Sequence, residues 1–509
     1  MGLAARCRVR GRRRAARARR RPPRAVLGRA ARVPAVDRRA VRRGAALVLF
    51  NSYPFLGVFL PIVLAGFFVL RRQTARLVWI VVASYVFYGY AKDWFPALMA
   101  GSTVISFTTG LALARVTDPR RRRSVLATGI AGALGLLVYF KYAQFAAGNA
   151  SSFLSVVTGR GLPSLKAFTE GIALPVGISF YTFEAISYMV DVFRGDAEAE
   201  RNPLRYAFFI SFFPHLIAGP IVRYRKLEPQ LRRFYRLDSE LLLSGLLLFS
   251  LGLAKKVLVA DQIGRRIDPL LAHPGSMGVW QGWAAALGYA FQIYFDFAGY
   301  CDMALGLARM VGIELPWNFD RPYRARNPRE FWRRWNVTLS QWLRDYVYIP
   351  LGGNRRGDLR RDGNLLATMG IGGLWHGASF TFLAWGLWHG MLLVGHRRLS
   401  RLGLRVPGPI AVALTFFLVT IAFVFFRMHD AHGLAEVLLS MAGAHGVGSL
   451  PRDLVPFLLL AAGLTFAVPE EWRWSFQRWG VWRTAAVGLV TGLAVVLVNE
   501  TQRFIYFKF

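Results

Sequence analysis

Polar and ionisable side chains gather in one stretch of a chain that is otherwise strongly apolar. Between Asp296 and His389 the sequence is rich in Trp, Arg, His, Asn and Asp. Side chains of these types are costly inside a bilayer, so those that occur there usually serve binding or catalysis. We therefore expect the chemistry of this protein to lie within this stretch.

His376 is the strongest candidate for a catalytic residue. It follows Trp375 in the run 372–380, where small neighbours would let a substrate approach closely. A lone buried histidine can instead be a hydrogen-bonded structural residue. However, an imidazole titrates near neutral pH and suits proton transfer. We predict that His376 is a general base that removes the proton of an acceptor hydroxyl, and that Trp375 helps to bind a substrate.

A second group of candidates precedes His376 in the segment 331–346. The apolar spacing predicts a single helix, with one face formed by Phe331, Trp335, Leu339 and Trp342. A polar stripe beside that face holds Asn336, Ser340 and Arg344. An interfacial amphipathic helix would show the same pattern. We nevertheless predict a catalytic, orienting role for Asn336 and substrate or donor binding by Trp335, Ser340 and Arg344.

Two other histidines lie in apolar blocks. His389 follows His376 by thirteen residues, and in one continuous helix they would be about 20 Å apart. We therefore expect His389 either to be structural or to support residues of the site without touching the substrate. His215 lies in the block 205–222 beside Pro214, and such a helix breaker at membrane depth is tolerated where protein or water covers the freed backbone groups. This block is predicted to be re-entrant and to line a cavity, with His215 binding a substrate.

The elements that must position these residues are apolar helices. The chain is 54% hydrophobic and only 18% charged, and its hydrophobic residues form long blocks, which places it in lipid. We predict an all-α integral membrane protein with 11–13 transmembrane or re-entrant helices. The blocks fall at 54–70, 77–91, 97–114, 124–147, 172–192, 205–222, 240–260, 279–310, 364–378, 380–395, 409–427, 454–469 and 484–500.

The charge of the chain follows the same topology. The net charge of +37 comes largely from arginines in short segments between the apolar blocks, so it indicates cytoplasmic loops and not a nucleic-acid partner. This pattern places the start of the membrane domain on the extracytoplasmic side of the membrane. Some loop arginines could bind the phosphates of a co-substrate such as coenzyme A, or an acidic carrier protein. Most of them are expected only to set the orientation of the helices in the membrane. Asp296 and Asp345 are expected to pair with nearby arginines. With two cysteines and no ligand motif, we expect no metal site.

Residues 1–47 differ from the rest of the chain. They include seventeen arginines and no lysine, with no hydrophobic block. Such a segment forms no packed structure. It could be a basic arm that touches anionic lipid. We favour a disordered or misannotated extension, with the polytopic membrane domain at residues 48–509.

Several strings resemble those of the membrane-bound O-acyltransferase family, in its alginate O-acetyltransferase-like branch. They are 174–183, 215–220, 292–300, 331–353, 375–377 and the terminal 504–509. The resemblance implies helices around a central tunnel, with the invariant histidine of the family at His376. Asn336 departs from the pattern, because enzymes of this branch usually carry histidine there.

The resemblance also implies the reaction and its partners. No cofactor is expected to stay bound; acetyl-CoA or another acyl thioester, free or on an acyl carrier, would enter from the cytoplasm as co-substrate. The acceptor would be a polysaccharide or a periplasmic or surface acetyltransferase partner, and the enzyme would lie in the cell membrane, surrounded by lipid. A polytopic transporter or channel for an acyl or polysaccharide precursor is the alternative from another class.

Overall fold

A computed structural model describes most of the chain. The described residues are 49–158, 169, 171–233, 238–355, 357–403, 406–468, 480–500 and 504–505. All of them belong to the unit Ala46–Phe509, which is compact by its internal contacts. The extension predicted at residues 1–47 lies outside the described residues.

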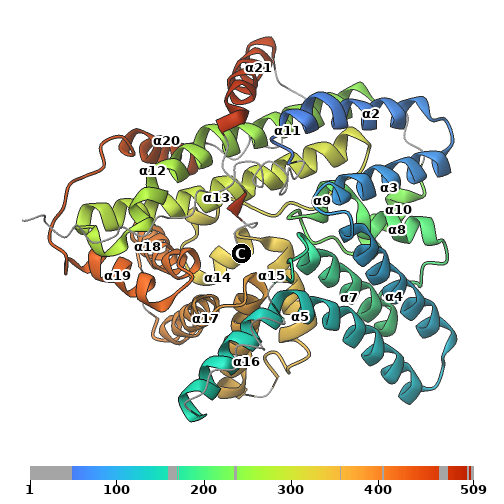
Figure 1. The fold of residues 1–509 in the computed structure, drawn as a ribbon, viewed down its shortest axis with the longest axis horizontal. Coiled ribbons are helices and arrows are strands. Elements are labelled where there is room, and N and C mark those ends of the chain that lie inside the picture. The colour runs from blue at the N-terminus through green and yellow to red at the C-terminus, as the bar shows by residue number, and fades with distance from the viewer. Residues whose placement is uncertain are drawn as a thin grey trace, which may run out of the picture. The chain divides into compact units, whose positions relative to one another are not determined.

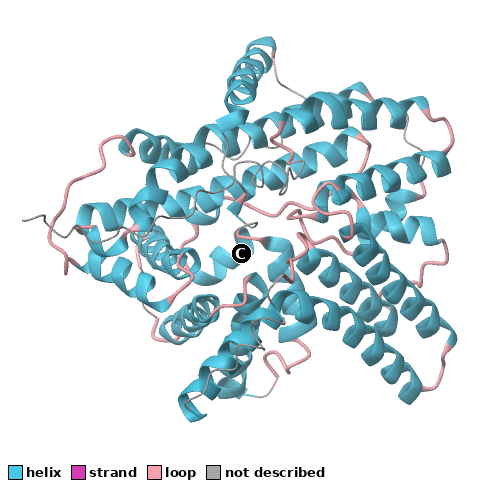
Figure 2. Cartoon of the chain, in the orientation of Figure 1, coloured by secondary structure: helices cyan, strands magenta, loops and turns pink. Residues whose placement is uncertain are grey.

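The described residues form helices and loops, with no strand among them (Figure 2). This confirms the all-α class. The first half contains η1 (Phe55–Phe59), α2 (Leu60–Val69), α3 (Gln73–Gly89), α4 (Phe95–Arg115), α5 (Pro119–Thr158), α7 (Ile178–Arg194), α8 (Pro203–Ser211), α9 (Phe213–Leu216), α10 (Tyr224–Leu231), α11 (Ser239–Ala254), η2 (Lys255–Ala260) and α12 (Asp261–Ala272).

The second half continues the helical pattern and contains the helices that carry the candidate residues. Its elements are η3 (Pro274–Ser276), α13 (Val279–Met310), η4 (Pro322–Arg324), α14 (Pro328–Arg334), α15 (Val337–Leu343), η5 (Arg344–Tyr348), α16 (Gly357–His376), α17 (Phe380–Ser400), α18 (Gly408–Arg427), α19 (Ala431–Ala442), α20 (Val455–Phe466), α21 (Val481–Val496) and η8 (Leu497–Glu500).

Each apolar block that the sequence predicts contains helix. Among the described residues, four helices are long and apolar enough to cross a bilayer by themselves: Phe95–Arg115, Pro119–Ser155, Ser239–Ala272 and Gly408–Arg427. Four shorter apolar helices accompany them, at Phe55–Val69, Ala431–Ala442, Val455–Phe466 and Thr484–Val496. Some of the other predicted blocks contain buried charged residues, such as Asp296 and Asp302 in 279–310, as expected for helices that face protein.

The block 205–222 is interrupted as its proline and glycine content predicts. Helix α8 ends at Ser211, Phe212 leaves the helical region with φ −50° and ψ 105°, and α9 is only four residues long. The segment is buried, and hydrogen bonds from other elements satisfy part of its backbone: the Ser84 hydroxyl accepts from the Phe213 N–H at 3.1 Å. The helix break is confirmed.

The segment 331–346 is not the single helix that its spacing predicts. Helix α14 ends before Trp335, whose backbone is extended, and Asn336 is left-handed with φ 42° and ψ 55°. Asparagine tolerates this conformation better than most residues. The distant Asn318 fixes the break, because its carbonyl and its side chain accept the N–H groups of Val337 and Thr338. The predicted apolar face is still buried at Phe331, Trp335, Leu339 and Trp342.

Candidate active site at the turn of a helical hairpin

His376 is the last residue of α16, at the tip of a helical hairpin. A three-residue turn, 377–379, reverses the chain, and α17 begins at Phe380 (Figure 1). Ser379 caps α17, because its hydroxyl accepts the Thr381 N–H at 3.2 Å. Serine is a preferred residue at this capping position. We call this tip the turn end of the hairpin and the opposite end, which carries arginines, the basic end.

The two helices of the hairpin are packed backbone to backbone near His376. A Cβ atom on Gly373 would collide with the carbonyl oxygen of Phe382, and one on Gly386 would collide with that of Met369. Glycine is therefore required for this close approach. The position of His376 relative to α17 is fixed by the two main chains.

Aromatic rings surround the His376 imidazole. Its centroid lies 4.9 Å from that of Trp375 and 5.0 Å from those of Trp385 and Phe426, each at a steep interplanar angle. The histidine is only 5% exposed. In a site enclosed in this way, hydrogen bonds and charges act more strongly than in solvent.

A lysine from another helix donates hydrogen bonds to the last carbonyls of α16. Lys141, in α5, donates to the carbonyls of Trp375 and His376, the latter at 3.2 Å, and to the Ser179 hydroxyl at 3.2 Å. Its neighbour Tyr142 donates to the Leu374 carbonyl at 2.6 Å. The last carbonyls of a helix have no partner within it, and a cation is favoured at that terminus. Lys141 thus orients the end of the helix that carries His376.

A cleft of about 730 Å³ opens beside the turn end. Lys141, Phe145 and Asn149 of α5 line one side of it, and the turn residues 377–379 line another. The loop residues His429 and Asp430 complete the wall. A volume of this size accommodates a small-molecule or sugar-sized group. The cleft brings such a group next to the turn that follows His376.

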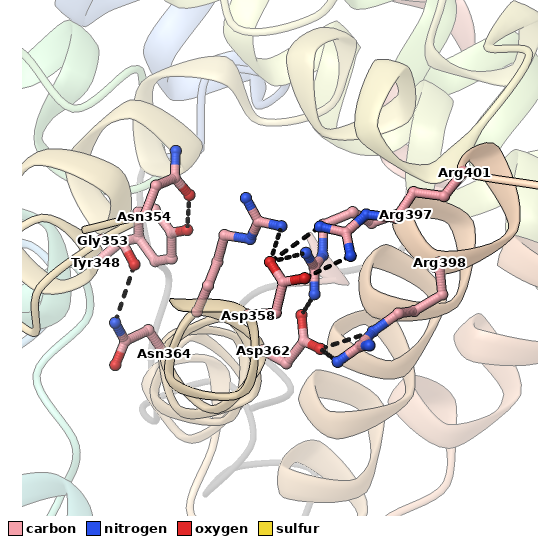
Figure 3. Close-up of polar contacts among 10 residues, drawn as sticks. Tyr348, Gly353, Asn354, Asp358, Asp362, Asn364, Arg397, Arg398 and Arg401 are labelled. Atoms are coloured by element: carbon pink, nitrogen blue, oxygen red, sulfur yellow. Dashed lines mark hydrogen bonds and ion pairs between the residues drawn. The ribbon is translucent and has the colours of Figure 1, made fainter. Parts of the chain in front are cut away.

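The basic end of the hairpin is held by an ionic network (Figure 3). Asp362, on α16, pairs with Arg397 and with Arg398, the latter at 2.5 Å. Asp358, one turn earlier, pairs with Arg397 at 3.0 Å and also with Arg401. Arg397 and Arg398 belong to α17 and Arg401 directly follows that helix, so the network ties the two helices together at the end far from His376.

The predicted residues Trp335, Asn336 and Ser340 lie at the break between α14 and α15. Trp335 connects to His376 through rings: its centroid lies 5.0 Å from that of Phe423, and Phe423 contacts Phe426. Asn336 is 1% exposed. The Ser340 hydroxyl donates to the Trp335 carbonyl at 3.3 Å, so it stabilises the break itself.

Arg344 and His215 make their polar contacts away from the rings that connect Trp335 to His376. The Arg344 side chain is 60% exposed and its Nε lies 2.6 Å from the Asp345 carboxylate. His215 is fully buried in α9, and its Nδ1 lies 3.1 Å from Glu184 of α7. Glu184 also accepts the Val222 N–H at 2.9 Å, so this pair joins the broken segment to α7.

The expected separation of His376 and His389 is wrong. The turn 377–379 folds α17 back along α16, and both histidines contact the same ring: the Trp385 centroid lies 5.0 Å from His376 and 4.9 Å from His389. The two imidazoles are therefore much closer than the 20 Å or so of a continuous helix. His389 is fully buried.

The two predicted aspartates do not behave alike. Asp345 pairs with Arg223 at 2.5 Å and with Arg344, as predicted. Asp296 pairs instead with Lys256 at 2.8 Å, which also binds Asp261, so the predicted arginine partner is wrong there. A buried carboxylate needs a cation, and the sequence leaves open which cation the fold brings to it.

Two residues that the sequence interpretation overlooked complete the site. Trp385 contacts both histidines, and Lys141 caps the helix that ends at His376. A signal for Lys141 was available, because a lysine within the apolar block 124–147 needs a partner or a function at that depth. Among the described residues, no three His, Cys, Asp or Glu side chains are grouped as a metal site would require.

Comparisons with known proteins agree with this architecture. Residues 179–429 match the model of MBOAT, the membrane-bound O-acyltransferase family. The chain is 42% identical over 404 residues to the probable alginate O-acetylase AlgI of Pseudomonas putida, covering 77% of this chain and 80% of the relative. It is 36% identical over 449 residues to the peptidoglycan O-acetyltransferase of Helicobacter pylori, covering 81% and 83%.

A more distant relative is the teichoic acid D-alanyltransferase of Bacillus subtilis, which is 30% identical over 234 residues, 43% of this chain and 58% of the relative. The fold and these matches define a helical membrane enzyme that transfers acyl groups. The chain belongs to the membrane-bound O-acyltransferase family.

Proposed function

We propose that this enzyme transfers an acetyl group from a cytoplasmic thioester to an exported polysaccharide, or to a periplasmic or surface partner that passes it on. The choice of acetyl and of a polysaccharide rests on the relatives, which are named an alginate O-acetylase and a peptidoglycan O-acetyltransferase. The donor is acetyl-CoA or another acyl thioester, and the enzyme lies in the inner or plasma membrane.

The orientation of the hairpin supports two-sided access. The arginine-rich basic end belongs in the cytoplasm by the distribution of positive charge. The turn end, with His376 and the cleft, then lies deeper or on the far side, since α16 is 20 residues long and extends about 30 Å. The donor approaches along the hairpin from the basic end, and the acceptor enters the cleft.

The observation that carries the catalytic assignment is the position of His376 at the tip of a fixed hairpin beside the cleft. Its imidazole takes the proton of the acceptor hydroxyl as that oxygen attacks the thioester carbonyl carbon. The new C–O bond forms, the C–S bond breaks, and the departing thiolate receives a proton from the imidazolium. Lys141 and the glycine contacts hold the base in place, and Asn336 helps to orient the reacting groups.

The test is the acetyl content of surface polysaccharide in a deletion strain complemented with wild type, His376→Ala or His273→Ala. His273 is an exposed residue that follows α12, so it is a matched control. Equal amounts of each protein in the membrane are confirmed first. We expect wild type and His273→Ala to restore acetylation and His376→Ala to fail. Full restoration by His376→Ala would show that another group is the base.

Family membership favours this activity over the transporter alternative. A transporter would conduct its substrate without dependence on His376. Purified protein in vesicles should therefore form acetyl ester on an added acceptor, with loss of the thioester, and should give no acceptor flux in the absence of donor. Flux that persists in His376→Ala vesicles would favour transport.

A further inference from the structure

Three side chains on the basic side of His376 form a buried group that the proposed reaction leaves without a role. Trp332 of α14 and Trp385 and His389 of α17 contact one another, with centroid distances of 5.8, 5.0 and 4.9 Å. We call them the indole–imidazole cluster. Trp385 also contacts His376, so the cluster adjoins the candidate base.

The polar atoms of this cluster have no hydrogen-bond partner within the described part of the chain. These atoms are the indole Nε1 of Trp332, the indole Nε1 of Trp385, and both ring nitrogens of His389. Leaving a buried polar group unsatisfied costs about 1–3 kcal/mol, and most such groups in native proteins are paired. Four of them at one place indicate a ligand that supplies the partners.

The chemistry of the cluster selects the kind of ligand. An indole only donates, while a neutral imidazole donates through one nitrogen and accepts through the other. The ligand must therefore offer carbonyl oxygens and an N–H group, which together make an amide. The rings of Phe331 and Phe426 pack against the cluster, and an apolar wall of this kind suits a neutral group better than a phosphate.

The place of the cluster on the hairpin indicates which of the two substrates, donor or acceptor, would contact it. Along α17 the order from the turn end is Trp385, His389 and then Arg397 of the ionic network. Along α17 the cluster thus lies between the turn end and the basic end, and none of its three residues lines the cleft. A donor that follows α17 from the basic end to His376 therefore passes the cluster, while an acceptor in the cleft contacts other residues.

We propose that the indole–imidazole cluster binds the amide-bearing pantetheine arm of the acyl thioester, with His389 as the residue that both donates to and accepts from an amide. This inference rests on the proposed thioester donor. Coenzyme A and acyl carrier proteins share this arm, so the cluster recognises either source by the same chemistry.

The test measures binding of radiolabelled acetyl-CoA to the purified full-length enzyme by equilibrium dialysis. Unlabelled pantetheine, adenosine 3′,5′-bisphosphate and an acetylated acyl carrier protein serve as separate competitors. In wild type, pantetheine should displace the label. Displacement by the carrier protein would identify a carrier as a source, and its absence would identify free acetyl-CoA. Should the carrier be the only donor, the labelled ligand is the acetylated carrier.

Matched variants separate the cluster from general packing. We expect His389→Leu and Trp385→Phe to weaken competition by pantetheine at least about 10-fold. His389→Gln, which keeps a donor and an acceptor, should stay within about threefold of wild type. Competition by the bisphosphate should not change. Trp388→Phe is the control, because the indole of Trp388 already donates to the Leu418 carbonyl at 3.1 Å.

The outcomes distinguish this inference from the proposed function. If wild type binds neither acetyl-CoA nor the acetylated carrier, the donor assignment fails and the inference fails with it. If wild type binds pantetheine and both His389→Leu and Trp385→Phe bind it equally well, only the inference is overturned. An equal loss in Trp388→Phe, or a loss of bisphosphate competition in His389→Leu, would also overturn it, because the effect would then be general.

Discussion

The two ends of the α16–α17 hairpin are held by different kinds of interaction, ion pairs at one end and aromatic packing at the other. The basic end is held by aspartates on one helix and arginines on the other, with several alternative pairs among them (Figure 3). The turn end holds one imidazole among aromatic rings, with a single lysine from α5 at the helix terminus. Charge fixes the hairpin at one end, so that the other end can keep a histidine in an enclosed apolar site.

The largest effect expected from this comparison is on the rate, at the turn end. His376→Ala should lower acetyl transfer by about 100-fold to 10,000-fold, the usual contribution of a general base. Its melting temperature should stay close to that of wild type. The measurement is transfer from labelled acetyl-CoA to polysaccharide in purified membranes, beside a thermal melt. If the variant transfers acetyl at the normal rate, the turn end is not the catalytic end of the hairpin.

The next effect is on stability, at the basic end. Asp362→Ala leaves Arg397 and Arg398 without their shared carboxylate, which is only 10% exposed. Breaking a partly buried ion pair by removing one partner should cost about 2 kcal/mol or more. The melting temperature should fall, while transfer per folded molecule stays near wild type. A variant that melts normally but transfers slowly would show that the network serves the reaction directly.

A third prediction tests whether the lysine at the turn end positions the base. Lys141→Met leaves the carbonyls of Trp375 and His376 without their donor, so the end of α16 should lose its fixed orientation. We expect kcat to fall by about 10-fold, or ~1.4 kcal/mol of activation free energy, with little change in KM. Lys141→Arg should recover part of the rate. Equal loss in both variants would point to a packing defect.

The smallest effect concerns the exposed part of the network. The hydrogen bond from Arg401 lowers the pKa of the Asp358 carboxyl below its ordinary value of 3.8. A carboxyl with a lowered pKa stabilises the folded state above its ordinary pKa, and this contribution disappears as the pH falls through the folded value. Melting temperatures of wild type and Asp358→Asn should therefore differ slightly at pH 7 and converge below about pH 3.8. A difference in melting temperature that stays constant across this pH range would show that ionisation of Asp358 does not contribute to stability.

Hydropathy alone located most of the helices. Helix α13 occupies Val279–Met310, the same residues as the predicted apolar block, and Gly312, with φ 78°, follows its end. Helix α16 begins seven residues before its predicted block, at Gly357, since its first two turns carry the charged residues of the basic end. Composition identifies residues that suit lipid, but charged turns that pair with another helix escape it.

The geometry of the candidate site could be predicted only in part. His376 was identifiable as a candidate, but its distance to His389 depended on a turn that contains no proline. Ser379, a favourable capping residue just before an apolar run, was the local sign of that turn. The break at Asn336 could not be predicted in this way, because it is fixed by Asn318, whose contacts across the loop become visible only in the fold.

The contact of main chains at Gly373 and Gly386 has a consequence for how such enzymes can diverge. Because backbone atoms, and not side chains, set the spacing of the two helices, the rings around the histidine can be exchanged without displacing it. Replacement of Phe426 by a smaller residue should enlarge the space beside the imidazole while the base keeps its position. New acyl chain lengths then become accessible to selection through single side-chain changes, on a scaffold that stays the same.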